Sequence, residues 1–353
     1  MDRIWLEQLI VMRDQLVLDI VREQYQLQPE FERYGQEGLT RAREDAGHHL
    51  DYVITALSSD SQLLFNAYVQ WAHSLFFHME LPPRTLETYF DLLLNALRHQ
   101  VNEGKLASDA VIHVERMILK GLENLQRPAA FSHESLGEPN PLQDELTTYT
   151  QLLVNADRHG AARLVHDLLE KDVDPRDLYK HLFHPFQIEL GTLWQRNQIS
   201  VAQEHFSTAA TQYIMSLMYD RIIRLPKKQR SMLGTCVSGE LHEMGIRMIC
   251  DYMECSEWNT YYLGANMPES GVVQMVKDKN PDLVAVSCTM PVHLPRVDGL
   301  IRQLRKNGVE KPILVGGYPF NLDPDLWRST GADGCATGFD QVVALAESLA
   351  GGE

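Results

Sequence analysis

Apolar side chains recur three and four positions apart through the first 125 residues of the chain. This period places them on one face of an α-helix, as in the run at 50–57. Helix-breaking or helix-capping residues interrupt the pattern at Pro29, 58–60, 82–83 and 108–109. The pattern therefore predicts an all-helical domain of about five helices.

A segment rich in proline, glycine and serine follows at 128–141 and predicts a linker. Helical periodicity then resumes at Leu142 and continues to about residue 225. Short breaks near 172–175 and 198–200 interrupt it. This spacing predicts a bundle of four helices.

Beyond residue 226 the helical period gives way to short apolar, β-rich runs, which lie at 232–237, 260–263, 283–287 and 312–315. Near-continuous hydrophobicity is typical of parallel strands that are buried on both faces, and helical stretches separate these runs. We therefore expect a βαβ domain at the end of the chain. The predicted units are an all-helical domain at 1–127, a linker at 128–141, a helical bundle at 142–226 and an α/β domain at 227–353.

The net charge of the chain limits the classes of molecule that it could bind. The chain has 48 acidic and 32 basic side chains, a net charge of −16, and both of its halves are acidic. A phosphate backbone needs concentrated lysine and arginine, so we expect no nucleic-acid partner. No apolar run approaches the roughly 18 residues of a membrane span, and no signal peptide follows Met1, so we expect a cytoplasmic protein without a membrane partner. All five cysteines lie after residue 230 without a CxxC pair, which predicts reduced thiols.

Two of the predicted strands end in polar side chains that could bind a ligand or a metal. The first strand is followed by Glu240 and His242, a spacing at which a carboxylate can fix the tautomer of a metal-binding imidazole. The third strand ends in Ser287 and Thr289, whose hydroxyls would extend such a hydrogen-bond relay. A pair of glycines follows the fourth strand and would let an elongated ligand lie against the backbone. Because ligands bind where parallel strands end, we expect one shared site.

These residues form the string Glu240-x-His242-x-x-Gly245, Ser287-x-Thr289 and Gly316-Gly317. The string resembles the cobalamin-binding motif, written Asp/Glu-x-His-x-x-Gly, Ser-x-Leu/Thr and Gly-Gly. The resemblance implies a flavodoxin-like Rossmann domain. It also implies that His242 is the lower axial ligand of cobalt, that Glu240 is its hydrogen-bond partner, and that the last four residues of the string line the slot for the nucleotide tail.

A second string lies in the predicted bundle, where nine residues separate Trp194 from Glu204 and His205. It resembles the Trp-x9-Glu-His signature of adenosylcobalamin photoreceptors of the CarH type. The resemblance implies that Trp194 packs against the adenosyl group, that Glu204 hydrogen-bonds it, and that His205 lies near the same face. In that type a histidine follows the tryptophan and takes the upper cobalt position after photolysis. Here that residue is Gln195, and the winged-helix DNA-binding domain of that type is not found ahead of the bundle.

The first domain resembles globin-like sensor domains related to phycobiliproteins and stress-response sensors, on the segments 34–38, 41–45 and 48–52. Joined to a CarH-like module, it resembles the photocobilins, which hold cobalamin and biliverdin. A bilin pocket needs aromatic walls, arginines for the propionates and a polar group facing the pyrroles. The candidates are Arg41, Arg43, His48, His49, Tyr52 and Trp71. Because this half has no cysteine, a bilin would be non-covalent; haem is the competing ligand, with His73 or His99 as its axial residue.

The leading hypothesis is a light sensor rather than an enzyme. Light would break the Co–C bond of adenosylcobalamin, the adenosyl group would leave its pocket and the cap would shift. The output would be light-dependent assembly of a homo-oligomer or contact with a separate effector protein. The alternative is a corrinoid shuttle of a methyltransferase system, whose upper face must admit a methyl donor and acceptor. A mutase subunit is a third option, but no substrate barrel is found in 353 residues.

Overall fold

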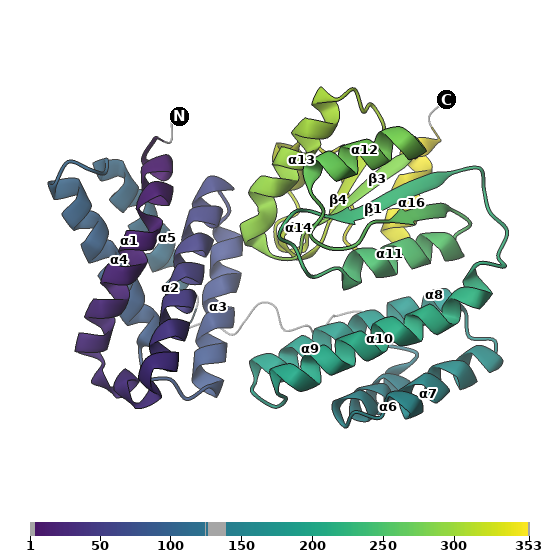
Figure 1. Cartoon of the computed structure of the whole chain (residues 1–353), viewed down its shortest axis with the longest axis horizontal. Helices are drawn as coiled ribbons and strands as arrows, with labels where there is room; N and C mark the ends of the chain where they lie inside the picture. The colour runs from purple at the N-terminus through teal and green to yellow at the C-terminus, as the bar shows by residue number, and fades with distance from the viewer. Residues whose placement is uncertain (1–3, 124, 126–138, 352–353) are drawn as a thin grey trace. The chain divides into compact units, whose positions relative to one another are not determined.

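The computed structural model describes residues 4–123, 125 and 139–351, and the chain divides into two compact units, Met1–Glu134 and Ser135–Glu353 (Figure 1). Each unit is described by itself. The linker predicted at 128–141 lies, up to residue 138, outside the described residues. Within the described part of the chain, no helix combines the length and the hydrophobicity that a membrane crossing requires.

The first unit is all-helical, as predicted. Its elements are α1 (Ile4–Leu27), the 3-10 helix η1 (Pro29–Tyr34), α2 (Gly35–Ser58), α3 (Gln62–His78), α4 (Thr85–Asn102) and α5 (Ser108–Glu123). Pro29 begins the 3-10 turn that separates α1 from α2, because proline lacks the N–H that a continuing helix would need. Ser61 caps α3 by accepting a hydrogen bond from the Leu64 N–H. Fully buried Leu50, Phe65 and Phe90 belong to the core of this unit.

The second unit begins with a helical cap. Its elements are α6 (Gln143–Val154), α7 (Arg158–Glu170), α8 (Pro175–Leu178), the π-helical turn η3 (Tyr179–Phe183), α9 (His184–Gln195) and α10 (Val201–Ile222). The segments α8, η3 and α9 follow one another without a break, so the cap has the four helices that the sequence predicted. The separation of α6 from α7 was not predicted: Ala156 has a φ of 61°, and Asp157 caps α7.

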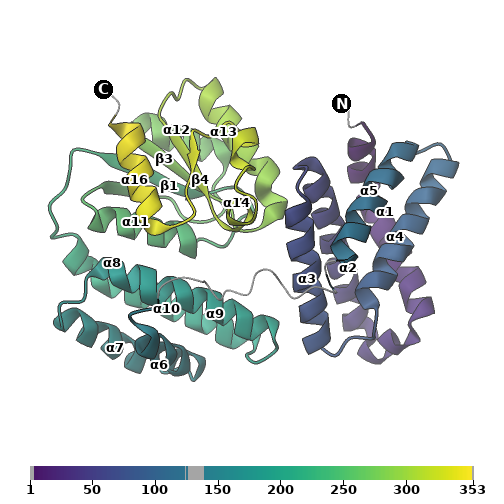
Figure 2. The ribbon, with the colours of Figure 1, turned by 180° about the vertical axis from the view of Figure 1, so that it is seen from behind.

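An α/β domain completes the second unit. Its strands β1 (Ser231–Cys236), β2 (Asn259–Tyr262), β3 (Leu283–Ser287), β4 (Ile313–Gly316) and β5 (Gly334–Cys335) form a parallel sheet in the order β2-β1-β3-β4-β5. This is the flavodoxin-like order. The helices are α11 (Met244–Cys255), α12 (Glu269–Lys279), η4 (Pro291–His293), α13 (Leu294–Lys306), α14 (Tyr318–Leu322), α15 (Trp327–Thr330) and α16 (Phe339–Ala350). Figures 1 and 2 show α12 and α13 on one face of the sheet and α11 and α16 on the other.

The cap packs on the α/β domain through α11. Met248 and Tyr252 of α11 share a buried apolar cluster with cap residues. Polar contacts cross the same boundary: Tyr179 of η3 donates to Asp251 at 3.0 Å, and Gln212 of α10 donates to Glu243 at 3.1 Å. The two parts of this unit are therefore joined by one continuous core, and the middle of α10, at Gln212, comes close to the start of α11.

Candidate functional site

The loop between β1 and α11 is held by one fully buried carboxylate, that of Glu240. Its Oε1 accepts hydrogen bonds from the His242 backbone N–H at 2.9 Å and from Nδ1 of the same residue at 2.7 Å. Its Oε2 accepts the backbone N–H groups of Thr289 at 2.9 Å and Met290 at 2.8 Å. Glu240 therefore ties the loop to the end of β3 through four hydrogen bonds.

These hydrogen bonds settle the protonation states of the pair. Burial on its own raises the pKa of Glu240, but hydrogen bonds from His242 and Met290 outweigh it and lower the pKa to about 2. The ionised carboxylate only accepts, so Nδ1 of His242 carries a proton, and in the neutral imidazole Nε2 therefore keeps its lone pair. The hydrogen bond to Glu240 also raises the pKa of His242. The His242 side chain is 58% exposed, so Nε2 is open to a metal ligand position.

Further contacts fix the same loop, and the sequence analysis missed them. Gly239 has a φ of 82°, and its N–H donates to Oδ1 of Asn266 at 2.7 Å. Arg296 of α13 donates to the Ser238 carbonyl at 2.6 Å. A Cβ atom at position 239 would lie 2.3 Å from Nη1 of Arg296, so a side chain there would displace this contact. The two supporting residues come from other elements, and no local motif marks them.

The glycine pair after β4 permits a close approach to the end of β3. Ser287 pairs with Gly316 in the sheet, and the Cys288 N–H donates to the Gly316 carbonyl at 3.0 Å. Gly317 has a φ of 110°, and a Cβ atom there would lie 2.0 Å from the Cys288 carbonyl oxygen. Backbone thus forms the wall of this edge, as expected for a site where a ligand lies against the chain.

The structure brings the predicted lower residues to one edge of the sheet, with two differences from the expectation. Thr289 reaches Glu240 through its backbone N–H, whereas the sequence analysis expected a hydroxyl relay. Gly245 lies in the first turn of α11, where a Cβ atom would meet nothing within 4 Å, so lack of space does not explain this glycine. Four of the five cysteines are buried, and Cys335 is partly buried.

The residues of the upper string lie in the cap. Trp194 is near the end of α9 and packs against the cap core. Glu204 and His205 are in the first turn of α10, which a capping box between Ser200 and Gln203 begins. Oε2 of Glu204 is 2.6 Å from Nδ1 of His205.

Glu204 of the upper string has an electrostatic effect on His242 of the lower string. The carboxylate of Glu204 contributes, after the larger effect of Glu240, to raising the pKa of His242, so the first turn of α10 acts electrostatically on that imidazole. A single exposed imidazole with a fixed tautomer, beside a backbone-lined edge, suits a metal that arrives within a macrocycle. In the described residues no three His, Cys, Asp or Glu side chains gather to hold a bare ion.

Three of the six bilin candidates meet on the first unit through a residue that the sequence analysis missed. Nδ1 of buried His49 is 2.5 Å from the hydroxyl of Tyr68, whose ring stacks on Tyr52 at 3.7 Å between centroids. Trp71 lies 6.1 Å from the same ring. Burial lowers the pKa of His49 to about 3, so this imidazole is neutral. The common partner, Tyr68, gives no local signal in the sequence.

The other three candidates lie elsewhere on α2. Arg41 pairs with Glu37 at 2.6 Å on the solvent face, and His48 is exposed. Arg43 lines a groove of about 710 Å³ that α1, η1 and α2 form. The structure therefore divides the six residues between an aromatic cluster, a solvated helix face and a groove.

Comparison with known families identifies the second unit. Residues 230–346 match the family described as "B12 binding domain", and residues 145–219 match a second family with the same description. The fold and the site thus define a cobalamin-binding module, composed of a four-helix cap and a Rossmann-like domain.

Individual relatives carry the same module. The chain is 22% identical over 185 residues to dimethylamine corrinoid protein 1 of Methanosarcina acetivorans, across 50% of this chain and 84% of that protein. It is 25% identical over 120 residues to the HTH-type transcriptional repressor CarA of Myxococcus xanthus, across 34% of this chain and 41% of that protein. The solved monomethylamine corrinoid protein of Methanosarcina barkeri shares the fold, with a TM-score of 0.52, 18% identity and coverage of 59% of this chain and 99% of that chain.

Proposed function

We propose that this protein is a light sensor that binds adenosylcobalamin in its second unit and biliverdin, non-covalently, in its first. One observation supports the proposal: the Glu204 carboxylate of the cap helps to raise the pKa of His242, so a residue of the upper string acts on the imidazole of the lower one. A carrier of methyl groups needs only the lower histidine. A tryptophan of the cap, Trp194, would favour a protected upper face.

The residues of the site would divide the work of holding the cofactor. His242 would supply Nε2 to cobalt from below, and Glu240 would keep the proton on Nδ1. The backbone around Gly317 and the end of β3 would line the nucleotide tail. Trp194 and Glu204 would cover and hydrogen-bond the upper ligand. Bound adenosylcobalamin supplies a cobalt–carbon bond that visible light breaks.

The signal would leave through the contacts between the cap and α11. Trp194 would cover the upper ligand while it is bound, and the first turn of α10 would be able to move once that ligand had left. The hydrogen bonds from Gln212 to Glu243 and from Tyr179 to Asp251 hold the cap against α11 and would be the first to respond. A shift of this kind biases a two-state equilibrium, which alters self-association or exposes a surface to an effector protein.

The second candidate is a corrinoid shuttle of a methyltransferase system. The relation to dimethylamine corrinoid protein 1 favours it, because the shared region includes half of this chain. A shuttle and a light sensor differ in what the upper face must do. A shuttle exchanges a small methyl group repeatedly in darkness, whereas a sensor retains a bulky ligand until light arrives.

The deciding experiment compares the two reactions on one preparation of the full chain. Protein loaded with adenosylcobalamin in darkness should change its absorption spectrum and its elution volume under green light. Protein loaded with methylcobalamin should not transfer methyl groups with a partner methyltransferase in darkness. Dark methyl transfer without a green-light response would overturn the sensor. Expression with a bilin source should add absorption bands in the red region, and their absence would remove biliverdin from the proposal.

A further inference from the structure

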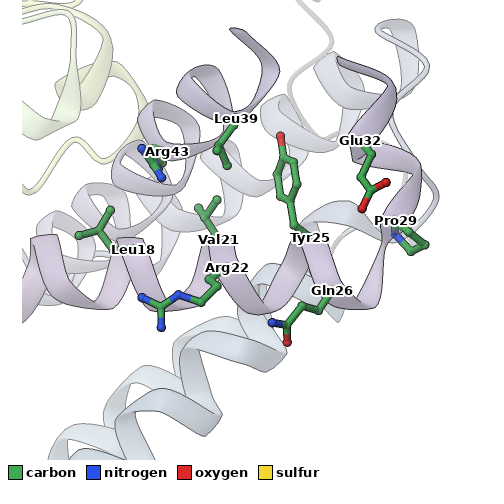
Figure 3. A pocket seen from close by; sticks show the side chains of 9 residues that line it. All are labelled: Leu18, Val21, Arg22, Tyr25, Gln26, Pro29, Glu32, Leu39 and Arg43. Atoms are coloured by element: carbon green, nitrogen blue, oxygen red, sulfur yellow. The ribbon is translucent and has the colours of Figure 1, made fainter. Parts of the chain in front are cut away.

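A groove of about 710 Å³ on the first unit combines an apolar middle with charged ends. Figure 3 shows Leu18 and Arg43 towards one end, Pro29 and Glu32 towards the other, and Tyr25 between them. The remaining lining residues are Val21, Arg22, Gln26 and Leu39. None of the aromatic cluster around His49 takes part, so this groove is a separate feature of the unit.

Two polar groups of the groove are left without partners among the described residues. The hydroxyl of Tyr25 is shielded from solvent and has no hydrogen-bond partner there. Its ring stacks on Phe31 at 5.3 Å between centroids, which fixes its direction. Burial raises the pKa of Tyr25, so the phenol keeps its proton and is a hydrogen-bond donor without an acceptor among the described residues. Such a donor is unfavourable in a folded chain unless something else satisfies it.

The second such group is the guanidinium of Arg43. Other arginines nearby are paired: Arg41 with Glu37 at 2.6 Å and Arg13 with Asp51 at 2.6 Å. Arg43 has no ion pair within the described part of the chain, and it acts electrostatically on the phenol of Tyr25. The guanidinium of Arg43 and the phenol of Tyr25 therefore belong to the same groove.

We propose that this groove binds an elongated apolar molecule that carries a carboxylate. Arg43 pairs with the carboxylate, the Tyr25 hydroxyl donates to a second acceptor, and the aliphatic side chains of the middle cover the apolar body. Glu32 at the opposite end repels an anion, so the charged end of the ligand lies at Arg43. An unpaired cation, an unsatisfied donor and an apolar floor together match this one ligand class.

Two sources supply that chemistry: the propionates of an open-chain tetrapyrrole and the head of a long-chain fatty acid. The inference goes beyond the proposed function because it assigns a place, away from His49 and Trp71, and holds for either source. Only its tetrapyrrole arm rests on the proposed function.

The test uses the full chain, loaded with adenosylcobalamin in darkness and titrated separately with biliverdin and with palmitate. Arg43→Gln removes the cation and should weaken binding about tenfold or more, and Tyr25→Phe should weaken it about fivefold. The matched control is Arg98→Gln, which alters an exposed arginine of α4 that pairs with Glu115 outside the groove and should leave affinity within about twofold. Melting temperatures show whether each variant is folded. Tyr25→Phe removes no hydrogen bond, so the melting temperature of this variant should not fall.

The outcomes separate the sources and the two proposals. Arg43-dependent binding of biliverdin supports a tetrapyrrole, and Arg43-dependent binding of palmitate alone supports a fatty acid. Failure of both ligands to bind, or equal affinity of Arg43→Gln and the unaltered protein, overturns the inference. Loss of biliverdin affinity in Trp71→Ala but not in Arg43→Gln places the bilin at the aromatic cluster, and it overturns the inference where palmitate also shows no dependence on Arg43. Green-light spectra of the same samples test the light sensor independently.

Discussion

Glu240 accepts the Nδ1 hydrogen of His242 at 2.7 Å while its other oxygen accepts two backbone N–H groups after β3. One buried side chain thus fixes both the tautomer of the candidate axial ligand and the position of its loop on the sheet. The imidazole is exposed, yet its orientation is set from inside the protein. The first prediction tests this arrangement.

Glu240→Gln keeps the side-chain volume but removes the charge and turns one end of the group into a donor. That end meets only N–H groups, so the hydrogen bonds that orient His242 are lost in part. We expect cobalamin affinity to fall by about 10–100-fold, the range for altered partners of metal-binding histidines. Titration of the absorption spectrum measures this. Glu310→Gln, at an exposed position, is the control, and equal affinity of both variants would contradict the assignment.

Gly317→Ala tests the close approach of β4 to β3. The new Cβ atom would lie 2.0 Å from the Cys288 carbonyl oxygen at a φ of 110°. Backbone must move to relieve this overlap, and we expect a loss of stability of about 1–3 kcal/mol together with weaker cobalamin binding. Thermal unfolding measures the first effect. Gly191→Ala, in α9 with nothing within 4 Å of its Cβ, should instead leave stability equal or slightly higher.

Much of the fold could be predicted because its elements have strong local patterns. The four apolar runs that predicted strands became β1 to β4. Burial leaves little room for polar residues in β1, β3 and β4, whereas the edge strand β2 is only partly buried and was marked by its threonine and tyrosines. The fifth strand, Gly334–Cys335, could not be found, because two residues carry no periodicity. The separation of α6 from α7 was missed for a related reason: it depends on the positive φ of Ala156, a residue type that normally favours helix.

The candidate site was predictable where it follows the ends of strands, and not where it depends on distant elements. Glu240 and His242 are two residues apart, so their spacing in the sequence is enough to predict their interaction. Asn266 and Arg296 hold the same loop from 27 and 58 residues away, and only the folded sheet brings them there. Tyr68 joins the aromatic candidates of the first unit in the same way. Contacts between residues so far apart in the sequence produce no regular spacing from which they could be predicted.

Asp251 predicts a pH dependence at the boundary between cap and α/β domain. Burial raises its pKa from 3.8 to about 6, against a weaker opposing effect of the Tyr179 hydrogen bond. The folded state therefore binds this proton more tightly than the unfolded state, and stability falls as pH rises from about 4 through about 6. The full effect is at most about 3 kcal/mol. Melting temperatures recorded between pH 4 and pH 8 measure it.

Asp251→Asn should remove this dependence, because an amide keeps an acceptor for Tyr179 and carries no charge. Above pH 6 the variant should melt at a higher temperature than the unaltered protein, and the difference should shrink as the pH falls through 5 towards 4. Asp220→Asn, whose side chain is 73% exposed and pairs with Arg224, is the matched control and should leave the pH profile unchanged. The same fall in melting temperature with rising pH in Asp251→Asn would assign the effect to another group.

His205 should determine the lit state, because Gln195 stands where photoreceptors of the CarH type have a histidine. Nδ1 of His205 lies 3.0 Å from the Val201 carbonyl, which leaves Nε2 for a ligand position, and the side chain is 75% exposed. His205→Ala should therefore keep the dark spectrum of the adenosylcobalamin-loaded protein and change the spectrum after green light. His166→Ala, an exposed histidine of α7, should change neither. Identical lit spectra for all three proteins would mean that a group other than this imidazole succeeds the adenosyl ligand.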